Sequence, residues 1–348
     1  MEPNFAKQFF YSLGVFALIF FWTNVFWDYS GELVSRIKGP KLATVSEVVN
    51  IVDKKEPVVE KPNIKLAFVG DIMLDRGVKY SVNKNLGGDY GELFSKVKDQ
   101  LQSYDYLFGN LEGPISDKGS DGGNLYSFRF EPKVVSVLKE AGFDIFSVAN
   151  NHIFNWGIEA FKDTLENLSD ANINYVGGGS SGGDAYQEKI VDIKGLKVAF
   201  LAFSEFKEGA VSATSSKAGI ALISEEQVKN EVSQVRSAAD LVIVSFHFGD
   251  EYEDSPNTFQ RKYAKLAIDA GADLIVGHHP HVVENPEQYK NSWIAYSLGN
   301  FIFDQNFSDK TMWGGLLEVE VNPADKLIEK VTLKKVNLNR MFQVESIE

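Results

Sequence analysis

Apolar, strand-like runs alternate with amphipathic, helix-like segments from about residue 64 to residue 321, and few folds accommodate this alternation. Continuous apolar strands separated by helices are typical of an α/β fold in which a largely parallel sheet is buried on both faces. The expected strands are Lys65–Gly70, Tyr106–Gly109, Asp144–Ala149, Lys197–Phe203, Leu241–Phe246, Asp273–Val276, Trp293–Ser297 and Gly315–Val321. The expected helices are Gly91–Gln102, Pro132–Ala141, Ile158–Ser169, Glu225–Ala238 and Thr258–Ala270.

The amino-terminal part has a different pattern, because the run from Phe9 to Trp27 contains no charged side chain. A helix of about 19 residues spans about 30 Å, the thickness of a hydrocarbon core. A cleaved signal peptide is the alternative, but the run is too long for its apolar core and no small-x-small cleavage site follows. We therefore expect an uncleaved membrane anchor. Lys7 on one side and Arg36, Lys38 and Lys41 on the other leave its orientation open.

These patterns divide the chain into four expected regions. A membrane anchor covers residues 1–28 and a polar linker covers residues 29–62. Within the linker, Lys54-Lys55-Glu56-Pro57 and Glu60-Lys61-Pro62 are typical of a spacer that holds a domain away from a membrane. The densely patterned domain covers residues 63–336, and a C-terminal tail covers residues 337–348.

The charge and the cysteine count exclude several kinds of site. The formal net charge is -13, whereas nucleic-acid recognition depends on an excess of Lys and Arg, so we expect no nucleic-acid partner. The chain contains no cysteine, which excludes disulfides and thiolate zinc sites. An acidic protein can still bind an anion through a metal, because the charge of the metal dominates its surroundings.

Side chains of the metal-ligand type follow five of the expected strands. In chain order they are Asp71, then Asn110 and Glu112, then Asn150, Asn151 and His152, then His247, then His278, His279 and His281. All five histidines of the chain belong to this set. Because ligands of α/β sheets bind beyond the carboxyl ends of the strands, we expect these side chains to meet on one rim.

Each of these residues has an ordinary structural interpretation when it is taken alone. Asp71 could form a turn or a helix cap, the Asn-Asn-His sequence could form a turn, and His247 could be a core histidine. The three imidazoles of His278, His279 and His281 are harder to explain by packing. Imidazole, carboxylate and amide ligands together suit Zn, Mn or Fe, one or two ions per chain, rather than calcium. Two such ions could clamp a phosphoryl group and activate water.

The residues around these positions form a series of short motifs, and together they resemble the CapA family, which takes part in poly-gamma-glutamate capsule synthesis. The resemblance covers roughly residues 64 to 305. The motifs are Gly70-Asp71-Ile72-Met73-Leu74, Asn110-Leu111-Glu112-Gly113-Pro114, Phe128-Arg129-Phe130-Glu131-Pro132, Asn150-Asn151-His152, His247-Phe248-Gly249-Asp250-Glu251-Tyr252, Gly277-His278-His279-Pro280-His281-Val282 and Ser297-Leu298-Gly299-Asn300-Phe301.

The CapA family in turn resembles calcineurin-like metallophosphoesterases, which implies a four-layer α-β-β-α sandwich with two mixed β-sheets. The resemblance also implies that His152 is an acid or transition-state stabiliser beside the metal-binding amide of Asn151. The implied metal ligands are Asp71, Glu112, Asn151, His247, His279 and His281, with Asn110 as the alternative to Glu112 and His278 as the alternative to His279.

Two residues depart from the superfamily pattern. Met73 occupies the position of the histidine in the usual Asp-x-His opening. Glu112, in an Asn-x-Glu sequence, stands where a metal-bridging aspartate is usual. Either change could remove one metal or weaken its binding.

The resemblance and the anchor together imply a capsule-synthesis protein with a metal-dependent, phosphoesterase-like hydrolase site at the cell envelope. The alternative is a capsule-polymer assembly or export component with little or no catalytic activity, which binds an anionic polymer. We expect a single-pass protein of the cell membrane with its soluble domain on the extracytoplasmic side. The expected partners are the membrane, an anionic polymer or phosphoester substrate, and other capsule-synthesis membrane proteins.

Overall fold

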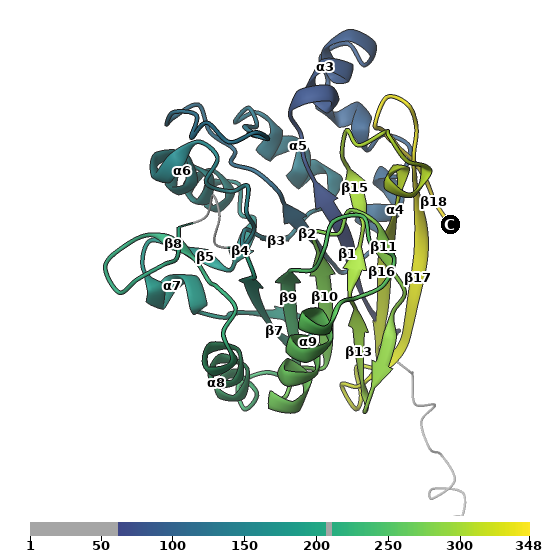
Figure 1. Ribbon diagram of the computed structural model, residues 1–348. Coiled ribbons are helices and arrows are strands. Elements are labelled where there is room, and N and C mark those ends of the chain that lie inside the picture. The colour runs from purple at the N-terminus through teal and green to yellow at the C-terminus, as the bar shows by residue number, and fades with distance from the viewer. Residues whose placement is uncertain (1–61, 207–210) are drawn as a thin grey trace, which may run out of the picture. The chain divides into compact units, whose positions relative to one another are not determined.

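Two mixed β-sheets form the frame of the protein in the computed structural model, which describes residues 62–206 and 211–348 (Figure 1). These residues belong to the second of two units in the chain, residues 61–348. The expected anchor and nearly all of the expected linker lie outside the described residues. No helix within the described ranges is both long enough and apolar enough to cross a membrane.

The first sheet has eight strands, in the order β18-β17-β16-β1-β2-β3-β4, with β15 also paired to β1. β1 runs parallel to β2 but antiparallel to β16, where Val69 lies opposite Leu316. The strands are β1 (Ile64–Ile72), β2 (Tyr106–Leu111), β3 (Ile145–Ser147), β4 (Asn174–Val176), β15 (Asn300–Ile302), β16 (Trp313–Val321), β17 (Ile328–Leu338) and β18 (Val344–Ile347).

The second sheet has six strands, in the order β12-β13-β10-β9-β7-β6. Its four central strands are parallel, and β12 and β6 complete the edges in the antiparallel direction. Each sheet therefore contains both parallel and antiparallel pairs. The sequence pattern predicted largely parallel sheets, and this prediction holds only for the central strands. The strands are β6 (Lys189–Ile193), β7 (Leu196–Ser204), β9 (Leu241–His247), β10 (Leu274–His278), β12 (Glu287–Tyr289) and β13 (Ser292–Ala295). Two small pairs are β5 (Gly178–Gly179) with β8 (Gly219–Ile220), and β11 (Val283–Glu284) with β14 (Ser297–Leu298).

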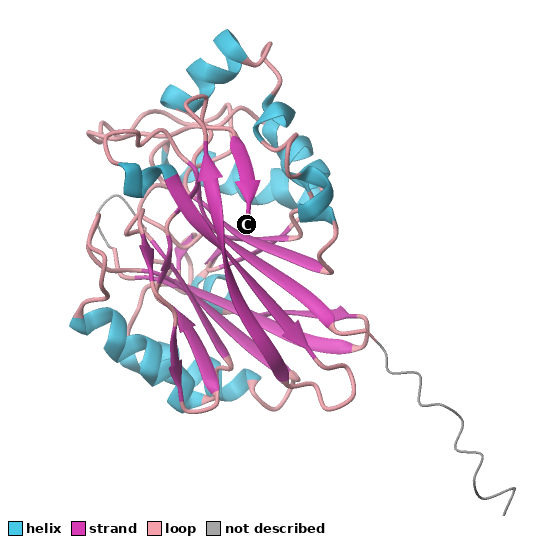
Figure 2. Cartoon of the chain, turned by 90° about the vertical axis from the view of Figure 1, so that its right-hand side faces the viewer, coloured by secondary structure: helices cyan, strands magenta, loops and turns pink. Residues whose placement is uncertain are grey.

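Helices cover the outer face of each sheet, and the strands lie between them (Figure 2). Successive residues of a strand point to opposite faces, so Phe68 of β1 packs with Phe200 of β7 between the sheets, while Ala67 and Val69 pack under helices. The first sheet is covered by α3 (Arg76–Asn85), η1 (Tyr90–Leu93), α4 (Lys98–Gln102), α5 (Val134–Ala141) and α6 (Gly157–Asp170). The second is covered by α8 (Glu225–Val235) and α9 (Thr258–Ala270), while α7 (Gly182–Tyr186) lies beside β5 and η2 (Asp309–Met312) precedes β16. The four-layer α-β-β-α sandwich implied by the resemblance is confirmed.

The elements expected from the sequence are present with one exception. All of the expected strands occur within a few residues of their expected bounds. The helix expected over Gly91–Gln102 is instead two short helices, η1 and α4, joined by a turn. Leu93, Val97 and Leu101 are all buried, so the apolar spacing that predicts one helix is kept by the interrupted segment.

Residues 337–348 belong to the first sheet and are not a separate tail. β17 continues to Leu338, and Val336 pairs with Ile347 of β18 at the edge of the sheet. Lys96 and Glu345 form an ion pair of 2.6 Å that ties this edge to the segment before α4. β17 is half-exposed along most of its length, and its sequence therefore lacks the continuous apolar run by which a buried strand is recognised.

Candidate metal centre

The carboxyl ends of the central strands of both sheets meet at one rim. In the first sheet Asp71 of β1 lies opposite Asn110 of β2, and in the second sheet His247 of β9 lies opposite His278 of β10. Asn110 Nδ2 is 3.4 Å from His247 Nδ1, so the ends of the two sheets are in direct contact. The common rim expected from the strand pattern is confirmed.

Glycines allow a close approach of the backbone at this rim. A Cβ atom on Gly70 would lie 1.9 Å from the carbonyl oxygen of Gly299, and one on Gly277 would lie 1.8 Å from that of Tyr296. Because glycine has no Cβ, the strand ends can pack directly against the segment 296–300. That contact brings Asn300 to the site.

Asp71 is fully buried and surrounded by donors. Its Oδ1 accepts a hydrogen bond of 2.8 Å from Asn110 Nδ2 and lies 3.4 Å from His278 Nδ1. Its Oδ2 accepts a hydrogen bond of 3.2 Å from the backbone N–H of His279 and lies 3.3 Å from His281 Nδ1. Burial alone would raise the pKa of Asp71, but the hydrogen bonds and charges of His278 and His281 hold it well below the usual value. The carboxylate is therefore ionised and available as a ligand.

Glu112, one residue beyond β2, is also fully buried. Its Oε2 accepts a hydrogen bond of 3.3 Å from Asn110, whereas Oε1 has no hydrogen-bond partner among the described residues. Oε1 lies 3.7 Å from His281 Nε2 and 3.9 Å from His152 Nε2. Burial and the negative charge of Asp71 raise the pKa of Glu112 well above its usual value. A cation next to Oε1 would stabilise the ionised carboxylate against both burial and the negative charge of Asp71, and would therefore lower the pKa of Glu112.

Asn110 is the alternative to Glu112 as a ligand, and its orientation favours Glu112. Its Nδ2 points to the carboxylates of Asp71 and Glu112, while its Oδ1 accepts a hydrogen bond of 3.2 Å from Asn150 Nδ2. Asn150 also donates to the carbonyl of Leu111 at 2.8 Å, and therefore ties the end of β3 to the end of β2. Asn110 and Asn150 thus position the ligand-type residues around them.

Asn151 and His247 present their ligand-type atoms to each other. Asn151 Oδ1 is 2.9 Å from His247 Nε2. Burial and the neighbouring His279 lower the pKa of His247 well below its usual value, so its ring is neutral. A neutral imidazole and an amide oxygen are both suitable ligands of a divalent transition metal.

His152 lies at the edge of the site with one nitrogen directed toward it. Its Nδ1 is 2.9 Å from Asn155 Oδ1, which also accepts a hydrogen bond from the backbone N–H of Phe128. The Phe128 ring packs on the imidazole with 4.1 Å between centroids. Because Asn155 Oδ1 is an acceptor, Nδ1 carries the proton of the neutral ring and Nε2 carries the lone pair that faces Glu112. Burial lowers the pKa of His152 to about 4, so the ring is neutral near pH 7.

His281 is oriented by an amide on the opposite side of the site. Its Nδ1 is 3.0 Å from Asn300 Oδ1, and Asn300 Nδ2 donates to Gln305 and to the carbonyl of Thr311, each at 3.0 Å. His281 therefore donates from Nδ1 and presents Nε2 as its ligand atom. Burial lowers the pKa of His281, but the charges of Glu112 and Asp71 outweigh it and raise the pKa to about 9.

The loop after β10 places its histidine rings on different sides. His279 and His281 have φ angles of 100° and 59°, in the left-handed region that side chains rarely adopt. His279 packs on Phe206, with 4.0 Å between ring centroids, and its buried Nδ1 has no partner among the described residues. His278 is fully buried, and its ring stacks at 6.2 Å from that of Phe108, between the sheets. His278 Nδ1 lies 3.4 Å from Asp71 alone, whereas a nitrogen of His279 lies within 4.8 Å of ligand atoms of both Glu251 and His281, which favours His279 of the two alternatives.

Two groups of three residues present ligand atoms within 4.8 Å of one another. We call Asp71, Glu112 and His247 the strand-end group, and Glu251, His279 and His281 the loop group. A buried polar atom without a partner costs about 1–3 kcal/mol, and the site contains such atoms on Glu112, His278 and His279. A divalent metal would satisfy buried carboxylate and imidazole atoms together, so the residues fit the metal that the resemblance implies.

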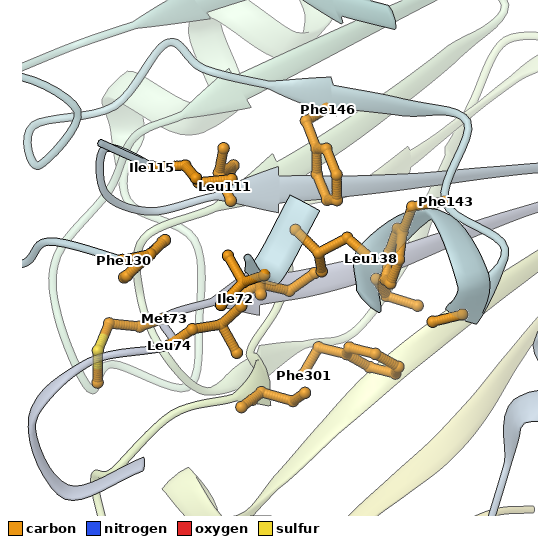
Figure 3. Packing of buried hydrophobic residues seen from close by; sticks show 14 of the residues in the cluster. Ile72, Met73, Leu74, Leu111, Ile115, Phe130, Leu138, Phe143, Phe146 and Phe301 are labelled. Carbon is orange, nitrogen blue, oxygen red and sulfur yellow. The ribbon is translucent and has the colours of Figure 1, made fainter. Parts of the chain in front are cut away.

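The structure brings every predicted ligand to the site and adds Glu251, which the sequence interpretation passed over. Glu251 lies in the motif that begins at the end of β9. It is one of several acidic residues in this loop, so the sequence alone does not identify it as a ligand. Met73, by contrast, packs with Phe130 in the apolar cluster between the first sheet and its helices (Figure 3). It is fully buried, and its sulfur accepts a hydrogen bond of 3.2 Å from the backbone N–H of Asp75.

The site and the fold agree with comparisons to known proteins. The capsule biosynthesis protein CapA of Bacillus anthracis is 36% identical over an alignment of 283 residues that covers 77% of this chain and 68% of the relative. The PGA biosynthesis protein CapA of Bacillus subtilis (strain 168) is 35% identical over 248 residues, 70% of this chain and 64% of the relative. The chain thus spans about two thirds of the length of each relative.

A solved structure has the same fold. The putative 5'-nucleotidase from Staphylococcus aureus, solved in complex with alpha-ketoglutarate, superposes with a TM-score of 0.52 at 18% identity, over 78% of this chain and 54% of that chain. At this identity the likeness concerns the fold alone. The family model described as "Bacterial capsule synthesis protein PGA_cap" matches residues 65–305. Because that match covers more than half of the chain and includes every ligand-type residue above, the chain belongs to the bacterial capsule synthesis protein PGA_cap family.

Proposed function

We propose that this protein is a metal-dependent hydrolase of a phosphoester or a related bond, and that it acts in capsule synthesis at the cell envelope. The observation that carries the proposal is the convergence of six ligand-type side chains with His152 Nε2, which lies 3.9 Å from the free Oε1 of Glu112. Ligands and a proton acceptor around one point are what metal-assisted hydrolysis requires. The names of the two Bacillus relatives support the capsule role.

The strand-end and loop groups, with Asn151, would hold one or two divalent ions of Mn, Zn or Fe. When bound, such ions polarise the scissile bond and lower the pKa of water. Asn110 and Asn300 orient the ligands through the hydrogen bonds described above. His152, neutral near pH 7 and with its lone pair on Nε2, accepts a proton from water at the site and returns it to the leaving group.

A fixed cation beside His152 supports an anionic substrate. The Arg76 guanidinium is held by Asp304 through hydrogen bonds of 2.6 and 3.0 Å, with its carbon 5.1 Å from the centroid of the Phe128 ring. The same ring packs on His152. Arg76 uses two of its five N–H donors on Asp304, so three remain for a phosphoryl or carboxylate group.

We propose further that the run from Phe9 to Trp27 anchors the protein as a single membrane span, with residues 61–348 on the extracytoplasmic side. Its length and lack of charge support the proposal. The partners would then be the membrane, an anionic substrate at its outer surface, and other membrane proteins of capsule synthesis. Fractionation of cells, followed by protease treatment of intact cells, tests this proposal. A chain that stays in the soluble fraction, or that is protected in intact cells, would contradict it.

The second candidate is an assembly or export component that binds an anionic capsule polymer without turnover. The observation that favours it is Met73, which replaces a superfamily ligand and lies in the apolar core. In that case the metal would stabilise the rim or bind the polymer. Metal content and turnover, measured on the same sample, separate the two functions.

The test uses the full chain purified in detergent, stripped with chelator, reloaded with Mn, and assayed on a generic phosphoester. We expect metal-dependent turnover in the wild type. We expect His152→Ala to lose at least about 100-fold of it, since general acid–base catalysis contributes about 10²–10⁴-fold. Mass spectrometry of bound metal should give the same content for both proteins. No turnover in the loaded wild type would favour the assembly role, whereas full turnover in His152→Ala would show that His152 is not the proton acceptor.

A further inference from the structure

Met73 stands where the superfamily has a histidine ligand, so the ligands around Asp71 are one fewer than in the superfamily pattern. Met73 is fully buried among apolar residues and its sulfur is engaged by the backbone N–H of Asp75, so it presents no ligand atom to the rim. Asp71 and His281 remain at this part of the site, with Asp71 Oδ2 and His281 Nδ1 3.3 Å apart. A compensating ligand therefore has to come from another segment of the chain.

Glu251 lies where such a ligand is needed. One of its carboxylate oxygens is within 4.8 Å of ligand atoms of both His279 and His281. It is in the loop between β9 and α9, and the backbone N–H of Tyr252 donates a hydrogen bond of 2.8 Å to the carbonyl of Pro280. That bond ties the residue after Glu251 to the residue between the two histidines.

The turn that carries Glu251 is further fixed from both ends. Gly249 has a φ of 100°, and its N–H donates a hydrogen bond of 3.0 Å to Glu205 Oε2. On the other side, the Tyr252 hydroxyl accepts a hydrogen bond of 3.0 Å from Gln305, which also bonds Asn300. Asn300 is the residue that orients His281. The turn and the imidazole are therefore positioned by one connected set of hydrogen bonds.

We infer that Glu251 is a metal ligand that acts with His279 and His281 and replaces the ligand lost at Met73. Among the described residues Glu251 forms no ion pair with a lysine or arginine, and the charged or polar groups nearest its carboxylate are the Tyr252 hydroxyl and the imidazoles of the loop group. Two divalent ions carry four positive charges. Asp71 and Glu112 supply two carboxylates to balance them, and Glu251 supplies a third. The inference rests on the proposed function in one respect only, namely that the site binds metal. It does not require that the protein hydrolyses a substrate.

The test measures metal binding to the full chain in detergent. Mn²⁺ affinity and stoichiometry are measured by equilibrium dialysis with mass spectrometry, for the wild type, Glu251→Gln and Glu251→Ala. Glu253→Gln is the matched control, because Glu253 is an exposed glutamate of the same loop that belongs to neither ligand group. Thermal unfolding with chelator present checks that all four proteins are folded.

We expect both Glu251 variants to bind one ion at least tenfold more weakly, with Glu253→Gln unchanged. In a wild type that binds two ions, the variants should retain one ion at Mn²⁺ concentrations that saturate the wild type. Wild-type affinity and stoichiometry in both Glu251 variants would overturn the inference while leaving the proposed hydrolase in place. A wild type that binds no Mn²⁺ would overturn both.

Discussion

The strand-end group and the loop group present similar atoms to the same rim but are positioned by different means. Asp71 and His247 are part of paired strands, and their places follow from sheet register. His279 and His281 depend on two left-handed backbone conformations, and Glu251 depends on a turn beside them. Asp71, Glu112 and His247 are all buried, whereas Glu251 is exposed. Ladder hydrogen bonds fix one half of the site, and side-chain networks fix the other.

This difference predicts how the two groups respond to change. The backbone of a strand end is held by the hydrogen bonds of the sheet, so a substitution there removes a ligand while the backbone keeps its place. A loop ligand is held by a few hydrogen bonds, so its affinity for metal depends also on residues that never touch the ion. The following predictions test this difference, from the largest expected effect to the smallest.

Asp71→Asn should have the largest effect. Asp71 contacts histidines of the loop group as well as Asn110, and its charge is one of three that face the metals. We expect the affinity for Mn²⁺ to fall by more than about 100-fold, since loss of an outer hydrogen-bond partner alone costs about 10–100-fold. Dialysis with mass spectrometry measures the loss. Asp105→Asn, at the opposite end of the sheet, is the control and should bind normally. If Asp71→Asn retained both ions, the strand-end group would not dominate metal binding and the proposed difference between the two groups would be wrong.

The pH dependence of metal binding should be the next largest effect. His281 has its pKa raised to about 9 and holds a proton near pH 7, whereas the pKa of His247 is lowered and its ring is neutral. A metal at the loop group must displace the proton of His281, so affinity should rise about tenfold per pH unit up to pH 9. The raised pKa stabilises the metal-free fold fully below pH 6.5, and this stabilisation is lost as the pH rises through 9.

Titration calorimetry in buffers of different ionisation enthalpy counts the protons released on Mn²⁺ binding. Glu112, whose pKa is also raised, adds to the release from the strand-end group. His281→Gln should therefore lower the proton count without abolishing it. Metal binding that is independent of pH between 7 and 9 would show that His281 carries no proton in the metal-free protein.

Tyr252→Phe should have the smallest effect. It removes the hydroxyl that accepts the hydrogen bond of Gln305, two steps from His281, and leaves every ligand in place. We expect less than about tenfold weaker binding of one ion, because the contact is more remote than a direct partner of a ligand. Tyr80→Phe, on α3, is a matched control outside this network. If Tyr252→Phe weakened Mn²⁺ binding as much as Asp71→Asn, the loop group would contribute as much to the affinity as the strand-end group.

Much of the fold and of the strand-end group could be predicted from the sequence. Apolar runs that end in Asp71, Asn110, His247 and His278 mark strand ends, and parallel strands bring their carboxyl ends to one edge. The resemblance supplied the antiparallel parts and the four layers. The edge strand β18 was missed, because β17 and β18 alternate weakly and are partly exposed.

The rest of the site depends on conformations that residue types do not reveal. No sequence pattern states that His279 and His281 adopt positive φ angles, so the choice between His278 and His279 required the structure. Glu251 was missed for the same reason, since a turn and a hydrogen bond to Pro280 place it. The roles of Asn300 and Asn155 as orienting partners of histidines also follow only from contacts distant along the chain.

The pairing of β1 with β16 has a consequence for how the protein is made. Val69 and Leu316 are neighbours in the sheet although nearly the whole described chain separates them. Contacts between residues so distant in sequence form slowly, because a long loop must close before they are made. β1 is also the strand that carries Asp71. During synthesis β1 must therefore remain without its antiparallel partner until β16 emerges, and the metal centre can be completed only after His281 and Asn300 have been made.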